Sequence, residues 1–139
     1  MAGYSGTPLA KKLGIKPGAR VSLVGAPTGF EKTLHGLPED ARVVRGLRGA
    51  NFDVVLFFTK KESELRKRFG ELAGKLVEDG GLWVAWPKKA SGVATDVGDA
   101  VVRATGLEAG LVDNKVCAVD DTWSGLRFVV RLKDRPKKA

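Results

Sequence analysis

Histidine and cysteine are almost absent from this sequence. Its 139 residues include one histidine, His35, and one cysteine, Cys117. A single cysteine cannot form an internal disulfide, and no histidine lies close in sequence to activate this one as a nucleophile. We therefore expect Cys117 to pack as a small apolar side chain. With so few nitrogen and sulfur ligands, the sequence also argues against a transition-metal site.

Long hydrophobic runs are missing as well. The longest apolar stretches, residues 54–58 and 82–86, fall far short of the roughly 20 apolar residues that cross a bilayer. The first residues show no charged segment followed by an apolar one, so they do not have the pattern of a secretory signal. These absences predict a cytoplasmic protein with no membrane partner.

No set of side chains has the spacing of a catalytic centre. We find no nucleophile, base and orienting group that the sequence pattern would bring together. Asp120 and Asp121 are adjacent carboxylates, but neighbours in an extended segment point apart, which disfavours a shared proton. We expect one of them to accept hydrogen bonds from its own turn. The sequence thus predicts no catalytic residues and favours a function other than catalysis.

Positive charge, by contrast, is in excess, with a formal net charge of +8. Residues 133–139 supply +3 of it, from four basic residues and one acid. Lysine and arginine alternate with glutamate in residues 60–78, which is typical of a solvated helix surface. An anionic partner is compatible with this charge. A nucleic-acid surface is the less favoured alternative, because no stripe of aromatic residues interleaves the basic ones.

The length suits one compact domain, residues 1–132, followed by a basic tail at residues 133–139. Segments typical of strands and helices alternate, which predicts an α/β fold with a mostly parallel sheet, helices on both faces and a closing antiparallel hairpin. The expected strands are residues 20–25, 42–46, 53–59, 81–87, 115–119 and 126–132. The expected helices are residues 7–14, 29–34, one from about 60 to 79, and one that begins near Thr95.

Helix signals support three of these segments. Thr28 to Glu31 and Thr59 to Glu62 have the spacing of capping boxes, which place a helix start at each. The last helix is expected to bury one face, formed by Val97, Val101, Ala104 and Leu107.

The tryptophans fall into two groups. Trp83 and Trp86 are three residues apart in a predicted central strand, so they should point to opposite faces of the sheet. Trp123 is predicted to lie in the hairpin connection, either as a lid over the core or as a platform for a ring of a ligand. The lid is the favoured interpretation.

Two glycine turns precede predicted strands: Lys16-Pro-Gly18 comes before the first strand, and Gly80-Gly81 comes before a late one. Together with the element order and the closing antiparallel hairpin, these turns resemble class I S-adenosylmethionine-dependent methyltransferases, which have similar turns at both places. The resemblance spans most of residues 10–132 and implies a Rossmann-like, methyltransferase-like fold.

The positions that would hold the cofactor depart from this pattern. The family usually has an acid in the first strand and a Gly-x-Gly-x-Gly turn after it, whereas here Ser22-Leu23-Val24 leads into Gly25-Ala-Pro-Thr-Gly29. Pro27 has no N–H to offer a ligand. The family's second strand usually ends in Asp or Glu to bind the ribose, whereas residues 42–47 contain no acid. We therefore expect no cofactor, with S-adenosylmethionine as the alternative.

Three longer strings stand out in the sequence, namely Tyr4-Ser-Gly-Thr-Pro-Leu-Ala10, Trp83-Val-Ala-Trp-Pro-Lys-Lys-Ala-Ser-Gly92 and residues 113–129. They are similar to a family of small bacterial proteins that form a domain of unknown function. Such long matches are more specific than the short turns shared with methyltransferases. This second resemblance implies a fold and no established activity.

Ligands of open α/β sheets bind outside the carboxyl ends of the strands. That rule brings loops from four parts of this chain to one edge, where lysines and two helix N-termini would favour an anion. The alternative is that each lysine only begins a solvated loop. The predicted ligand-binding residues are Gly25, Thr28, Gly29, Lys60, Lys88, Lys89, Ser91 and Trp123.

The leading hypothesis is a non-catalytic methyltransferase-like module that binds an anionic or phosphate-bearing small molecule, such as a nucleotide. One alternative is a small S-adenosylmethionine-dependent methyltransferase with atypical cofactor contacts. The other is a scaffold or oligomerisation protein that uses the basic tail or an exposed helix.

Overall fold

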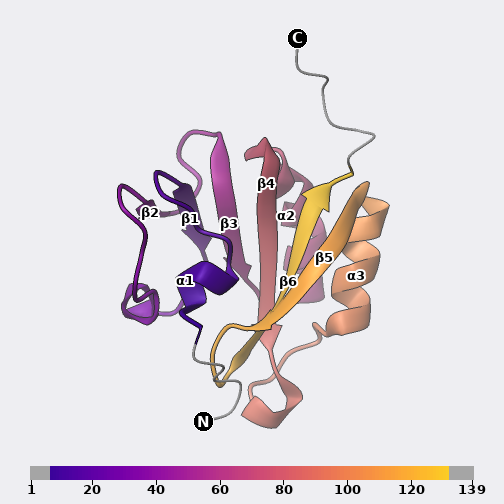
Figure 1. Ribbon diagram of the computed structural model, residues 1–139. Coiled ribbons are helices and arrows are strands. Elements are labelled where there is room, and N and C mark those ends of the chain that lie inside the picture. Colours follow the sequence, from indigo (N-terminus) through magenta and orange to yellow (C-terminus); the bar gives the residue numbers. More distant parts are fainter. Residues whose placement is uncertain (1–6, 132–139) are drawn as a thin grey trace.

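The computed structural model describes residues 7–131, which form one six-stranded sheet with helices on both sides (Figure 1). The strands lie in the order β2-β1-β3-β4-β6-β5. Their bounds are β1 Arg20–Val24, β2 Arg42–Arg45, β3 Phe52–Phe58, β4 Leu76–Pro87, β5 Leu111–Ala118 and β6 Trp123–Val130. The helices are α1 Leu9–Lys12, α2 Glu62–Ala73 and α3 Asp99–Glu108, with single 3-10 turns η1 at Phe30–Thr33 and η2 at Lys89–Ser91.

Strand directions confirm the predicted fold class. Strands β2, β1, β3 and β4 are mutually parallel, whereas β6 runs antiparallel to both β4 and β5. The carboxyl ends of β1, β3 and β4 therefore meet at one edge of the sheet, which we call the carboxyl edge. It is the lower edge in Figure 1, where η2 follows β4.

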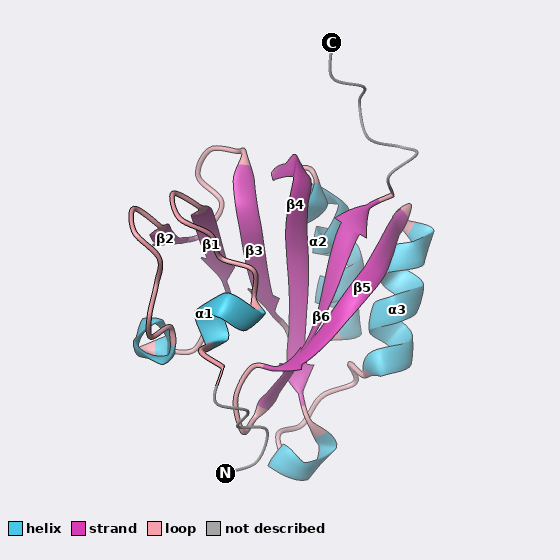
Figure 2. Ribbon diagram, viewed as in Figure 1, coloured by secondary structure: helices cyan, strands magenta, loops and turns pink. Residues whose placement is uncertain are grey.

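Helices cover the two faces of the sheet unequally (Figure 2). The front face carries α1 and η1, and the back face carries α2 and α3. Trp83 belongs to the front cluster of buried side chains and Trp86 to the back cluster, which confirms their predicted opposite directions. Strand β4 is thus buried on both faces.

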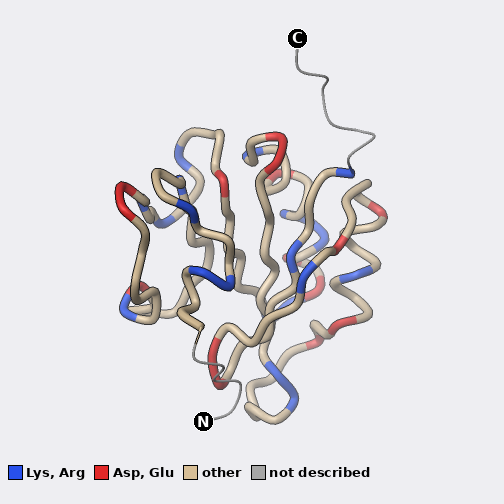
Figure 3. Tube along the Cα trace, viewed as in Figure 1, with Lys and Arg blue, Asp and Glu red and all other residues tan. Residues whose placement is uncertain are grey.

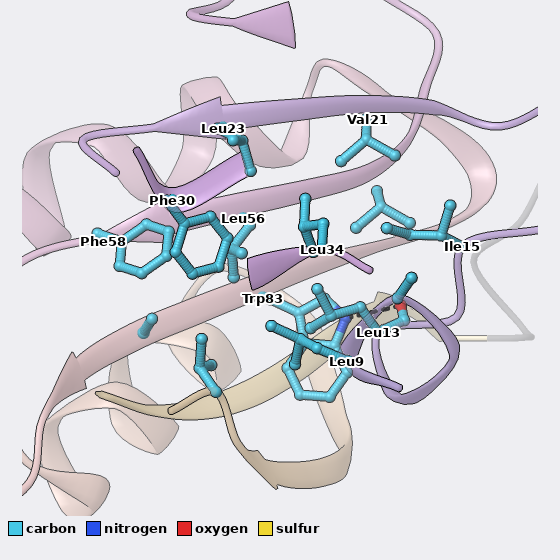
Figure 4. Close-up of a cluster of buried hydrophobic side chains, with 14 of the residues drawn as sticks. Leu9, Leu13, Ile15, Val21, Leu23, Phe30, Leu34, Leu56, Phe58 and Trp83 are labelled. Atoms are coloured by element: carbon cyan, nitrogen blue, oxygen red, sulfur yellow. Dashed lines mark hydrogen bonds between the residues drawn. The ribbon is translucent and has the colours of Figure 1, made fainter. Parts of the chain in front are cut away.

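Trp83 fixes the short helix α1 against the front face. Its ring is fully buried, and its Nε1–H donates to the backbone oxygen of Leu13 at 3.0 Å (Figure 4). An indole N–H in a core needs such an acceptor. This contact explains how a helix of four residues keeps its place.

Aromatic rings close the front cluster towards the carboxyl edge. The ring of Phe58 makes edge contacts with Phe30 at 4.9 Å and with Trp123 at 5.0 Å between centroids. Trp123 is the first residue of β6 and pairs with Pro87. The prediction that it lies in the connection was therefore wrong, although its half-buried ring does cover the core as the lid interpretation requires.

The back cluster brings α3 close to the sheet. An added Cβ at Gly106 would overlap the ring of Phe128, which stands edge-on to Phe69 of α2 at 5.3 Å. Only glycine at this position lets the Phe128 ring lie against the helix backbone.

Two helices differ from their predicted bounds. Helix α2 ends at Ala73 rather than near residue 79, because Leu76 already pairs with Phe52 as the start of β4. Helix α3 begins at Asp99 and buries Val102, Thr105 and Gly106. The predicted face is confirmed only in part: Val97, which precedes the helix, and Val101 pack with the back cluster, whereas Leu107 is 49% exposed.

Cys117 packs against the front cluster, as predicted. Partial burial raises the pKa of its thiol, which reduces its reactivity.

None of the helices within residues 7–131 is long and apolar enough to span a membrane. The predicted basic tail lies outside the described residues.

The Gly106 contact makes a prediction about stability. We expect Gly106→Ala to lower the free energy of unfolding by about 1–3 kcal/mol, because the added methyl forces α3 away from Phe128. Gly70→Ala in α2 is the matched control, since its added Cβ has no atom within 4 Å. That change should raise the free energy of unfolding by roughly 0.5–1 kcal/mol. Guanidinium chloride unfolding measures both, and equal effects would contradict the packing argument.

Candidate functional site

The turn after β1 presses against the end of β3. Gly25 has a φ of 71°, and an added Cβ there would lie 2.7 Å from the backbone oxygen of Phe58. Both the left-handed backbone and this close approach require glycine. The turn that follows, residues 25–29, is thereby fixed at the carboxyl edge.

Arg45, the last residue of β2, fills the inner side of this turn. Its Nη1 donates to the oxygen of Ala26 at 2.9 Å and its Nη2 to the oxygen of Pro27 at 2.8 Å. The same guanidinium forms a two-point ion pair with Glu31, at 2.7 and 2.8 Å. We call this set of contacts the Arg45 latch.

The latch changes the titration of Glu31. Hydrogen bonds from Arg45 lower the pKa of this carboxyl from 4.5 to about 2. The same contact raises the pKa of Arg45. Both groups therefore stay charged at neutral pH, and the turn carbonyls remain engaged by the protein's own arginine.

The predicted capping box at residues 28–31 does not form. Glu31 binds Arg45 instead, and Gly29 precedes η1 with no side-chain cap. Because η1 is a single 3-10 turn, it supplies no α-helix dipole beside Gly25, Thr28 and Gly29. The helix predicted over residues 29–34 is thus present only as a 3-10 turn and not as an α-helix.

An internal carboxylate caps the N-terminus of α2. The N–H of Glu62 donates to Oδ1 of Asp96 at 2.7 Å. Thr59, predicted to form a capping box with Glu62, donates its hydroxyl to Glu64 at 2.6 Å. The second predicted box was therefore wrong, because the loop before α3 delivers a stronger, charged acceptor.

That loop also ties Lys60 to the rest of the carboxyl edge. The backbone oxygen of Lys60 accepts from the hydroxyl of Thr95 at 2.7 Å and from the N–H of Asp96 at 3.3 Å. Thr95 thus holds two loops together rather than capping α3, whose first residue is Asp99.

A groove of about 630 Å³ lies between the end of β4, η2 and the start of α3. Apolar groups form much of its lining, namely Trp86, Pro87, Val97, Ala100 and Val101. Charged and polar residues complete it, namely Lys88, Lys89, Asp96, Asp99, Thr95, Gly98 and Ser124. Of the eight predicted site residues, Lys88 and Lys89 line this groove.

The acids of the groove already have partners inside the protein. Asp96 caps α2, and Asp99 forms an ion pair with Arg103 at 2.6 Å. Lys88 donates only to a neutral backbone oxygen, that of Asp120, at 2.8 Å. Within residues 7–131 the ammonium group of Lys89 has neither an ion pair nor a hydrogen bond, and the side chain is exposed. The uncompensated charge of the groove is therefore positive.

The other predicted residues lie outside the groove. Ser91 shapes η2, where its hydroxyl donates to the oxygen of Lys88 at 2.6 Å and accepts from the N–H of Val93. Trp123 lies on the opposite face of the sheet. Gly25, Thr28 and Gly29 belong to the turn closed by the Arg45 latch. The predicted residues thus divide between two places on the carboxyl edge.

Charge along the carboxyl edge is mixed (Figure 3). Asp120 accepts hydrogen bonds from the N–H groups of Thr122 and Trp123, both at 2.8 Å, which confirms the prediction of a carboxylate engaged by its own turn. Across the described part of the chain, no three His, Cys, Asp or Glu side chains gather in a way that could hold a metal ion.

Sequence reasoning missed two residues that shape this edge. The sequence does mark Arg45, because it stands in the segment where the methyltransferase pattern has an acid, but residue spacing does not reveal which groups it binds. Nothing in the sequence marks Asp96, since it caps a helix that begins 34 residues earlier.

Several solved structures share this architecture. A SAM-dependent methyltransferase from Aquifex aeolicus aligns with a TM-score of 0.62 at 17% identity, covering 88% of each chain. Magnesium protoporphyrin IX methyltransferase (ChlM) from Synechocystis PCC 6803 with bound SAM aligns with a TM-score of 0.56 at 13% identity, covering 83% of this chain and 71% of that one. At these identities the likeness shows the fold, which is Rossmann-like and methyltransferase-like.

A search of curated proteins finds no match. One family profile does match, and it covers residues 10–132, which is nearly the whole described chain. The chain therefore belongs to the family described as Protein of unknown function (DUF3052).

Proposed function

We propose that this chain is a non-catalytic binding module that takes an anionic, phosphate-bearing small molecule in the groove beside Lys88 and Lys89. The observation that carries this proposal is the charge of the groove. Its two acids are engaged by internal partners, whereas neither of its two lysines forms an ion pair within residues 7–131. A bound anion would balance the positive charge of these two lysines.

The shape of the groove agrees with such a ligand. Its volume of about 630 Å³ is within the range of small-molecule sites, which typically span roughly 300–1,000 Å³. Apolar side chains such as Trp86 and Val97 could contact a base or another ring, while the lysines at the rim bind the phosphate. A nucleotide combines these two parts.

The Arg45 latch supports a function other than methyl transfer. In the resembling enzymes an acid in this part of the second strand holds the ribose of the cofactor, whereas a guanidinium can only donate hydrogen bonds. Here it binds the turn carbonyls and Glu31. A cofactor would have to displace contacts that the folded chain already makes.

Removal of the two lysines tests the proposal. Isothermal titration calorimetry with AMP, ADP, ATP and inorganic phosphate should show binding to the wild-type chain. The double variant Lys88→Ala, Lys89→Ala should weaken it at least about tenfold, which is a loss of roughly 1.4 kcal/mol. Binding should also weaken as salt rises.

The matched control is the double variant Lys11→Ala, Lys67→Ala, which removes the same charge from two exposed side chains on α1 and α2. Its affinity should stay within a factor of about two of the wild type, since surface charges away from the site are screened. An equal loss of affinity in both double variants would show that only the net charge matters, and it would contradict the proposal.

S-adenosylmethionine provides a second test. We expect no binding tighter than roughly 1 mM, a dissociation constant that corresponds to only about 4 kcal/mol. The measurement is the same calorimetry with the cofactor as titrant. Micromolar binding would instead favour the methyltransferase alternative. Light scattering on the same sample would reveal self-association, as expected for the scaffold alternative.

The latch itself makes a prediction about pH. Since the folded-state pKa of Glu31 is depressed, the ion pair stabilises the turn above pH 4.5 and is lost as the pH falls through about 2. Carbon-detected NMR titration of the Glu31 carboxyl should give a midpoint near 2. In Arg45→Gln the midpoint should return towards 4.5. An unchanged midpoint in that variant would show that Arg45 does not set the pKa.

A further inference from the structure

The connection between η2 and α3, residues 92–98, forms one wall of the groove beside Lys88. Its last residues, 95–98, all line that space. The connection contains neither helix nor strand, and it passes along the lower edge of the sheet in Figure 1. We call it the strap. Because its backbone is not part of the sheet, its position depends on the contacts that it makes with other loops and helices.

Three hydrogen bonds attach the strap to the beginning of α2. Oδ1 of Asp96 accepts the N–H of Glu62 at 2.7 Å, and the hydroxyl of Thr95 donates to the backbone oxygen of Lys60 at 2.7 Å. The N–H of Asp96 donates to the same oxygen at 3.3 Å. The residues that line the groove therefore also hold the start of α2.

Asp96 gives α2 a charged cap that the residue before the helix does not provide. Lys61 precedes the helix and makes no side-chain cap within residues 7–131. A carboxylate at a helix N-terminus accepts from an N–H that has no partner inside the helix, and the helix dipole favours its charge. The cap thus stabilises α2 and the position of the strap together.

The strap has glycines at both ends. Gly92 has a φ of 75°, and an added Cβ at Gly92 or at Gly98 would meet no atom of the described chain within 4 Å. Of residues 92–98, only Val97 is buried. Glycines in uncrowded places often absorb the backbone rotation of a hinge. Loss of the hydrogen bonds to α2 would therefore let the strap move away from the groove.

We propose that Asp96 is a positioning residue for the groove: by capping α2, it holds the strap where residues 95–98 complete the binding site. This inference rests on the proposed function, because the groove is the site that it concerns. Without the cap, a smaller fraction of molecules has the complete groove, and the apparent affinity for a ligand falls by that fraction.

The charge of Asp96 alone predicts the opposite effect. Its carboxylate lines the groove, so its removal would lower the repulsion of a phosphate and raise the affinity. The positioning role predicts a lower affinity when the side chain is removed. The two explanations therefore differ in the sign of the change.

Amide hydrogen exchange of the free chain, measured by NMR, tests the attachment. In Asp96→Ala the amides of Glu62 and Val97 should exchange at least about fivefold faster, because the helix cap is lost. Asp96→Asn keeps an acceptor oxygen, so exchange should stay within a factor of about two of the wild type. Asp99→Ala is the matched control, since Asp99 also lines the groove but pairs with Arg103. It should leave the Glu62 amide unchanged. Unchanged exchange in Asp96→Ala would overturn the proposal.

Calorimetry with AMP, ADP and ATP tests the consequence for binding. For the nucleotide that the wild type binds most tightly, Asp96→Ala should weaken the affinity at least about fivefold. Asp96→Asn should bind at least as tightly as the wild type. Unchanged or higher affinity in Asp96→Ala would overturn the proposal. If the wild type binds none of the three, the proposed function fails, and exchange at Glu62 alone decides whether Asp96 holds the strap.

Thr95→Val is a second variant that leaves the charge of the groove unchanged. It keeps the shape of the side chain and removes the hydrogen bond to the oxygen of Lys60. It should speed exchange at Glu62 and weaken nucleotide affinity, in the same direction as Asp96→Ala. Absence of both effects would contradict the role of the strap.

Discussion

Burial of strand β4 on both faces is the constraint on which the structure depends. Residues 80–87 are all buried, and they contain only glycine, proline and hydrophobic side chains. Such a strand must be covered from both sides, because each face carries a tryptophan. On the back face two full helices do this. On the front face the indole N–H of Trp83 donates to the carbonyl oxygen of Leu13, and this hydrogen bond holds the single turn of α1 against the sheet.

Arg45 supplies hydrogen-bond donors to the turn at the end of β1, whereas an acid at this place would supply acceptors. A carboxylate at the end of β2 would accept hydrogen bonds and leave the turn open to a ligand with hydroxyl groups. A guanidinium offers only donors, so its partners must be acceptors, and the chain supplies two carbonyls and Glu31. The turn is thereby part of the protein's own packing.

The sequence predicted the sheet well because buried parallel strands are nearly continuous apolar runs, as in Phe52–Phe58. The predicted helix bounds were wrong where a contact between distant residues outweighed a local sequence pattern. Leu76 continues the period of α2 but pairs with Phe52, and Glu31 has a capping spacing but binds Arg45. At the candidate site, the lysines after β4 could be predicted from topology. The groove could not, since its far wall comes from α3 and its charge depends on Asp96, which caps a helix distant in sequence.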